Sequence, residues 1–118
     1  MNYRLAKIVK KAMNKQSKNS FELSNDMFGM KDYEGYFEGE HGKFVITVKE
    51  EHNNQIGVYI YYMPTDLLLL DKDMEWYVKD YKETGDIETI LQKLSDQFKD
   101  KTFLSKMEQD VIKKRKSK

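Results

Sequence analysis

The side chains able to bind a metal ion or transfer a proton are few, and they lie in segments that resemble turns. The two histidines are His41 and His52, and Glu38 and Glu40 stand close to the first of them. A metal could use such a group, but no second histidine stands at a supporting spacing. Turn residues of this kind are usually just exposed to solvent, so we expect no metal site.

Motifs for nucleophilic or phosphate chemistry are also missing. The chain contains no GxSxG, Walker or GxGxxG sequence, and it has no cysteine, which excludes disulfides, thiolate zinc sites and cysteine nucleophiles. The glycines of the EGYFEGEHGK stretch lie between expected strands rather than before a helix, so they form no phosphate cradle. Acidic pairs such as Glu50-Glu51 are too frequent to mark a general acid and base. The sequence therefore predicts a protein that is not an enzyme and needs no cofactor.

The elements that would position a binding surface follow from the spacing of apolar residues. Spacing of three and four predicts an amphipathic helix over about residues 3–15, and alternation predicts strands at 33–37, 44–49, 56–63 and 74–79. Residues 51–55 supply a reversal in which asparagine tolerates positive φ, and Pro64 ends the strand before it. Residues 21–31 are ambiguous, with turn-forming residues at 24–26 and 29 around a short apolar pair at 27–28. Residues 66–72 could form a helical turn or a crossing segment.

The C-terminal part has the pattern of two helices. Apolar spacing predicts them at 87–98 and 103–111, with Asp86 capping the first and a break near residues 100–102. Residues 113–118 are expected to form a flexible basic tail. With 118 residues the chain forms one domain, 1–118. The expected fold is α+β, a three- to four-stranded antiparallel sheet with an N-terminal helix and two C-terminal helices packed on it.

Charge is strongly segregated along the chain. Residues 1–18 carry six basic groups and no acid, and residues 112–118 carry five basic groups and no acid. The segment between them holds the remaining ten lysines against all twenty carboxylates, a balance of −10. Two basic ends thus flank an acidic middle, which is the most informative feature of the sequence.

The acidic middle suggests a surface that binds a basic protein. Carboxylates and exposed tyrosines on a sheet could dock on a nucleic-acid-handling enzyme and block or modulate it, as an anti-defence factor of a phage or mobile element would. The residues predicted for this surface are Glu34, Glu38, Glu40, Glu50, Glu51, Tyr59, Tyr61, Asp73, Glu75 and Tyr77. Two other interpretations remain open: the tyrosines could pack beneath a helix, and the carboxylates could neutralise the chain's own basic helix.

The basic ends suggest a different partner, DNA or RNA. Lysines and arginines along a helix could neutralise backbone phosphates and give salt-dependent affinity. The residues predicted for this alternative are Arg4, Lys7, Lys10, Lys11, Lys15, Lys113, Lys114, Arg115 and Lys116. A membrane partner is not expected, because no apolar stretch is long enough to span a bilayer and no Trp or Phe anchors the N-terminal helix. These features predict a soluble cytoplasmic protein whose oligomeric state is left open.

Overall fold

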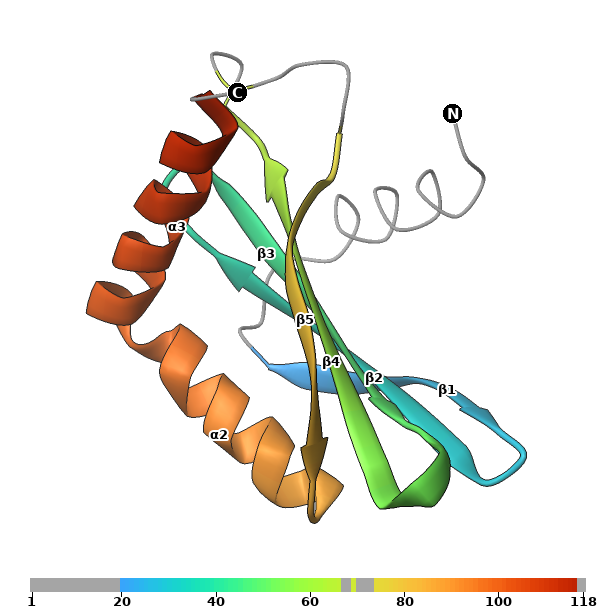
Figure 1. Ribbon diagram of the computed structural model, residues 1–118. Helices are drawn as coiled ribbons and strands as arrows, with labels where there is room; N and C mark the ends of the chain where they lie inside the picture. Colours follow the sequence, from blue (N-terminus) through green and yellow to red (C-terminus); the bar gives the residue numbers. More distant parts are fainter. Residues whose placement is uncertain (1–19, 67–68, 70–73, 117–118) are drawn as a thin grey trace.

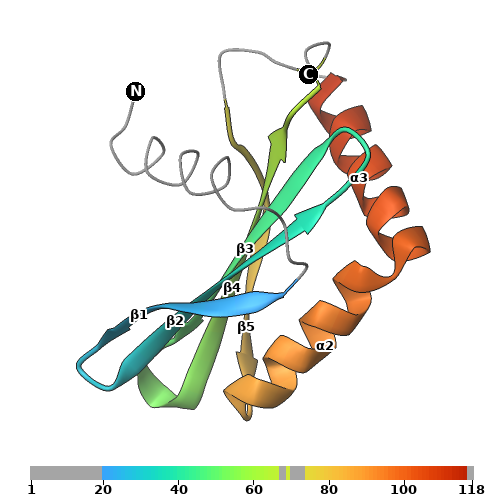
Figure 2. The ribbon, with the colours of Figure 1, turned by 180° about the vertical axis from the view of Figure 1, so that it is seen from behind.

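The computed structural model describes residues 20–66, 69 and 74–116. Within these ranges the chain forms an antiparallel sheet of five strands in sequential order, followed by two helices. Both helices lie on the same face of the sheet (Figures 1 and 2). The elements are β1 (Phe21–Met27), β2 (Met30–Glu38), β3 (Gly42–Glu50), the 3-10 turn η1 (His52–Asn54), β4 (Gln55–Pro64), β5 (Trp76–Thr84), α2 (Ile87–Lys99) and α3 (Lys101–Lys116).

The predicted fold class is confirmed in its main features and wrong in its strand number. The α+β class, the antiparallel sheet and the two C-terminal helices are all present, but the sheet has five strands rather than three or four. The helix expected over residues 3–15 lies outside the described residues, as does most of the segment 66–72.

The additional strand is β1, which the sequence did not reveal. It pairs with β2 across a two-residue turn in which Phe28 (φ 56°) and Gly29 (φ 78°) both adopt left-handed backbone. Two consecutive positive φ values are the signature of a tight hairpin turn. β1 lies at the edge of the sheet and a bulge interrupts it after Leu23, so its side chains do not show the alternation of a half-buried strand.

The hairpin of β3 and β4 confirms the strongest prediction from alternation. Its register runs from Gly42 opposite Pro64 to Glu50 opposite Ile56. Asn53 (φ 64°) and Asn54 (φ 58°) supply the positive φ angles of the reversal, as the sequence indicated. β4 ends at Pro64, which cannot donate a ladder hydrogen bond.

Two aspartates define the ends of the helices. Asp86 caps α2 by accepting a hydrogen bond from the backbone N–H of Thr89 at 3.1 Å, which confirms the predicted cap. Asp100 separates the helices, and its carboxylate accepts from the N–H of Thr102 at 2.9 Å. α3 then continues to Lys116, so residues 113–116 are helical and the tail prediction is wrong for them. Packing on the sheet extends this helix beyond its last predicted turn, because Val111 and Ile112 contact the core.

The hydrophobic core lies between the sheet and the two helices. We call the face of the sheet that meets the helices the inner face and the opposite one the outer face. Alternation places every second residue of each strand on the inner face. The core residues of the sheet and helices are Phe37, Phe44, Ile46, Val48, Ile56, Val58, Ile60, Tyr62, Trp76, Ile90, Leu94, Phe98 and Leu104.

Candidate functional site

The outer face brings together much of the predicted acidic and aromatic surface. The register places Glu34 opposite Thr47, and Thr47 opposite Tyr59, on the side that α2 and α3 leave uncovered. Tyr61 is half-buried beside a small apolar centre on this face. That centre consists of the buried residues Tyr36, Val45 and Met63.

Carboxylates outnumber lysines on this face. Alternation in the paired strands assigns five carboxylates and three lysines to it. The carboxylates are Glu22, Asp32, Glu34, Glu38 and Asp80, and the lysines are Lys43, Lys49 and Lys82. The surface is therefore acidic but mixed.

Tyrosine hydroxyls organise the carboxylates of the outer face. Three of them donate hydrogen bonds to acidic side chains, at 2.5 to 2.9 Å. The pairs are Tyr36 with Glu34, Tyr59 with Glu51, and Tyr77 with Asp80. Each bond fixes one oxygen of a carboxylate and leaves further lone pairs that can accept from a cationic partner.

Glu51 follows β3, outside the paired strands, and its carboxylate joins the outer face through Tyr59 and Lys82. Lys82 donates to both of its oxygens, at 2.6 and 2.7 Å, and the Tyr59 hydroxyl donates to Oε1 at 2.5 Å. These hydrogen bonds, first that of Lys82 and then that of Tyr59, lower the pKa of Glu51. The bond to Glu51 raises the pKa of Tyr59, so the pair consists of an ionised carboxylate and a neutral phenol.

We expect Glu51 to make folding more stable at neutral pH than in acid. Because the pKa of Glu51 is lower in the folded chain than its ordinary value of 4.5, its contribution is complete above that value. The contribution is lost as the pH falls through the lower, folded pKa. Urea denaturation at neutral and acidic pH should therefore show a smaller loss of stability on acidification for Glu51→Gln than for the unaltered chain. The exposed Glu40→Gln serves as the control, and an equal effect of both substitutions would contradict the assignment.

Tyr77 is an exposed aromatic residue of the outer face. Its side chain is 61 % exposed, and its ring meets that of Tyr61 edge to face with centroids 6.0 Å apart. Its hydroxyl donates to Asp80 at 2.9 Å, and this hydrogen bond raises the pKa of Tyr77. We call Tyr61, Tyr77 and Asp80 the Tyr77 cluster. The exposed ring of Tyr77 beside a carboxylate suits a guanidinium, which stacks on aromatics and pairs with carboxylates.

Other residues of the predicted surface lie elsewhere. Glu40 is exposed in the turn between β2 and β3, and Glu50 accepts a hydrogen bond from the Lys31 N–H at 3.2 Å at the far end of β3. Glu75 is half-buried just before β5. Asp73 lies outside the described residues. The predicted set is therefore not one patch, and it omitted three carboxylates of the outer face: Glu22, Asp32 and Asp80.

Glu108 is a buried carboxylate that the sequence did not single out. Only 2 % of it is exposed, and it accepts hydrogen bonds from the N–H groups of Glu40 (3.0 Å) and His41 (2.9 Å) and from the hydroxyl of Tyr62 (2.7 Å). All three donors are buried or partly buried. Glu108 thus ties the β2–β3 turn and β4 to α3, which is a structural role.

The histidines are placed as the sequence suggested, in turns. His41 Nδ1 lies 3.2 Å from Asp66 Oδ2, and His52 is exposed in η1. Within the described ranges, no three His, Cys, Asp or Glu side chains gather closely enough to hold a metal ion.

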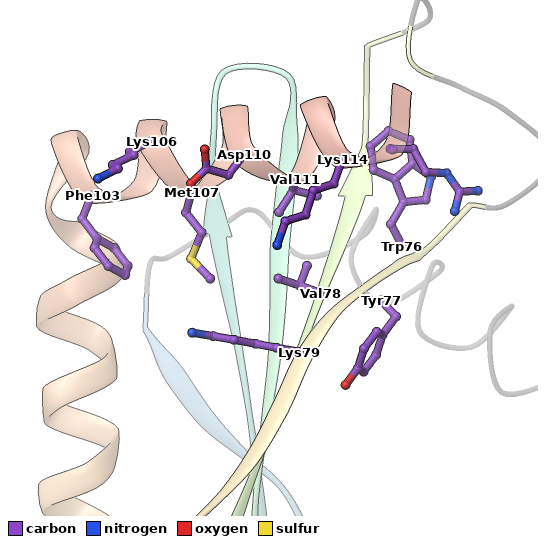
Figure 3. Close-up of a pocket in the computed structure, with 11 residues that line it drawn as sticks. Trp76, Tyr77, Val78, Lys79, Phe103, Lys106, Met107, Asp110, Val111 and Lys114 are labelled. Carbon is purple, nitrogen blue, oxygen red and sulfur yellow. The ribbon is translucent and has the colours of Figure 1, made fainter. Parts of the chain in front are cut away.

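A groove between β5 and α3 is the feature that the sequence missed. It has a volume of about 610 Å³ and is lined by apolar and cationic side chains from both elements (Figure 3). Periodicity placed residues 107 and 111 in the core, but it could not show that α3 and β5 leave a space between them. The lining residues are Trp76, Tyr77, Val78, Lys79, Phe103, Lys106, Met107, Asp110, Val111, Lys114 and Arg115.

The residues predicted to bind nucleic acid are described only at the C-terminal end. Lys113, Lys114, Arg115 and Lys116 form the last turn of α3, and the guanidinium of Arg115 lies over the Trp76 ring, 5.2 Å from its centroid. Arg4, Lys7, Lys10, Lys11 and Lys15 lie outside the described residues.

Two further observations bear on the class of protein. In the part of the chain that the structure describes, neither helix has the length and apolar character needed to cross a bilayer. No family model, curated protein or solved structure matches this chain.

Proposed function

We propose that this chain is a small non-enzymatic binding protein that docks through the outer face of its sheet on a basic, nucleic-acid-handling protein and inhibits or modulates it. This is the mode of action of an anti-defence factor of a phage or mobile element. The excess of carboxylates on the outer face supports a partner with a positively charged surface. Complementary charge of this kind speeds association and rejects partners of the wrong sign.

The Tyr77 cluster is the observation that carries the proposal. Interfaces derive most of their binding energy from a few aromatic and arginine contacts rather than from their whole area. Tyr77 offers an exposed ring beside Tyr61, and Asp80 offers a carboxylate already oriented by the Tyr77 hydroxyl. An arginine of the partner could stack on the ring and pair with that carboxylate.

Affinity capture with substituted chains tests the proposal. The full chain, used as bait in a nuclease-treated lysate of host cells, should retain one basic protein. Tyr77→Ala and Asp80→Asn, in separate baits, should each weaken its retention about tenfold or more. Glu88→Gln on α2 is the control, because it removes one exposed carboxylate on the helical side of the sheet. Unchanged retention by both variants of the Tyr77 cluster would refute the proposal.

The same experiment separates the alternative, a DNA- or RNA-binding accessory protein. If the basic ends bind nucleic acid, nuclease treatment should abolish the capture, and DNA or RNA should shift in a gel at low salt. The affinity should then fall steeply as salt rises. Charge reversal at Lys7, Lys10 and Lys11 should abolish that shift.

A further inference from the structure

The groove between β5 and α3 differs in chemistry from the outer face. Its floor is apolar: Val78 points from β5 toward α3, while Met107 and Val111 face it from the helix (Figure 3). All three side chains are half-buried. Trp76 closes one end and is only 3 % exposed, and Phe103, at the other end, is 36 % exposed. An apolar hollow of about 610 Å³ is large enough to take one or two aliphatic or aromatic side chains.

Cationic side chains surround this apolar floor. Four of the lining residues are basic, and one is acidic. The basic residues are Lys79, Lys106, Lys114 and Arg115, and the acid is Asp110. The groove is therefore positive although the sheet behind it carries an excess of carboxylates. A complementary ligand is anionic at its margins and apolar at its centre.

The strand that forms one wall lies at the edge of the sheet. Among the described residues β5 pairs only with β4, and the four consecutive residues Trp76 to Lys79 all line the groove. Consecutive residues alternate in side-chain direction, so a wall made of four in a row presents the backbone edge itself. The pairing with β4 shifts at this point, because Tyr61 lies opposite Tyr77 and Ile60 opposite Lys79. Such a bulge leaves an extra backbone residue, here Val78, outside the ladder with β4.

We propose that this groove binds an acidic segment of a partner protein in extended conformation, with its backbone along the edge of β5 and an apolar side chain on Val78, Met107 and Val111. Strand addition of this kind obtains affinity from main-chain hydrogen bonds and specificity from pockets for alternate side chains. A single-stranded nucleic acid fits less well, because the floor of Val78, Met107 and Val111 offers no ring on which a base could stack. Trp76, the aromatic ring at one end of this floor, is buried beneath Arg115. A symmetric pairing of two copies through this groove fits less well too, because two positive grooves would then face each other.

Binding of designed peptides to the full chain tests this inference. The probe is a short synthetic peptide in which glutamates flank a central Leu-Val-Phe. Isothermal titration calorimetry measures its Kd for the full chain. Charge reversal by Lys79→Glu together with Lys106→Glu should raise the Kd about tenfold or more. The matched control is Lys99→Glu with Lys101→Glu, which changes the net charge equally at exposed positions outside the groove and should leave the Kd close to that of the unaltered chain.

Two companion probes make the outcome decisive. A peptide with serines in place of the central apolar residues should bind at least about tenfold more weakly, because the floor of the groove then stays unfilled. Equal binding of both peptides would overturn the proposal, as would equal effects of the two double substitutions. Tight binding of a single-stranded oligonucleotide without binding of the peptide would assign the groove to nucleic acid. If the unaltered chain dimerises and the Lys79→Glu, Lys106→Glu chain does not, the groove is instead an interface between two copies of the chain.

Discussion

Replacing Glu108 by alanine is expected to lower the free energy of unfolding by roughly 3 kcal/mol or more. The substitution leaves three donors, the N–H groups of Glu40 and His41 and the hydroxyl of Tyr62, without their acceptor. Each unsatisfied group in a buried position costs about 1 to 3 kcal/mol. Urea denaturation followed by circular dichroism measures the loss.

The effect is large because the Glu108 side chain connects three elements. It lies on α3, binds the turn between β2 and β3, and meets β4 through Tyr62. Burial, followed by the hydrogen bond to Glu108, raises the pKa of Tyr62, so this phenol is a neutral hydrogen-bond donor at neutral pH.

Matched variants separate these contacts from a general effect on the helix. Glu108→Gln keeps one acceptor oxygen and should cost less than alanine, and Tyr62→Phe removes only one of the three donors. Gln109→Ala changes the exposed neighbour and should cost under about 0.5 kcal/mol. A loss for Glu108→Ala as small as that for Gln109→Ala would show that the carboxylate does not hold the turn.

Local signals account for the parts of the fold that the sequence predicted. The alternation of residues 44–48 and 56–62, with asparagines between, specified the β3–β4 hairpin and its reversal. The position of Asp86 before an apolar helical stripe specified the start of α2. In each case the information lies within about ten residues of sequence, so no long-range contact is needed to interpret it.

The elements that sequence reasoning missed depend on contacts between distant residues. β1 carries polar residues in its middle and is held by backbone pairing with β2 and by the contact of Phe21 with Phe37, whose ring centroids lie 5.4 Å apart. The last turn of α3 is rich in lysine and resembles a tail, yet Arg115 lies over Trp76, which is 39 residues earlier in the chain. Tertiary packing overrides local composition in both cases.

The candidate site was predicted in part for the same reason. Alternation correctly grouped Tyr59 and Tyr61 on one face, and Glu51 joins them through a hydrogen bond. The Tyr77 cluster depends on the register between β4 and β5, which no local pattern provides. Glu108 did carry a signal, because it lies four residues after Leu104 on the buried stripe of α3, where a charged residue needs buried partners.

The largest loss of stability is expected for Phe98→Ala. Phe98 is 2 % exposed and belongs to α2, and its ring meets those of Phe37 and Phe44, with centroids 5.5 Å away in both cases. It thereby joins the helix to β2 and β3 at the centre of the core. Removing a buried phenylalanine side chain costs about 3 to 5 kcal/mol, because the cavity that it leaves closes only in part.

Phe103 provides the comparison that makes this expectation specific. Its ring lies 5.4 Å from that of Phe98, but its side chain is 36 % exposed, so Phe103→Ala removes much less buried surface. The stability of a small domain is about 5 to 15 kcal/mol, so Phe98→Ala consumes a large part of it and should shift the urea midpoint far more than Phe103→Ala does. Phe98→Leu should recover most of the difference, since it refills the cavity with apolar atoms. Equal midpoints for Phe98→Ala and Phe103→Ala would mean that the helices do not meet the sheet through this ring, and the placement of α2 on the inner face would then be wrong.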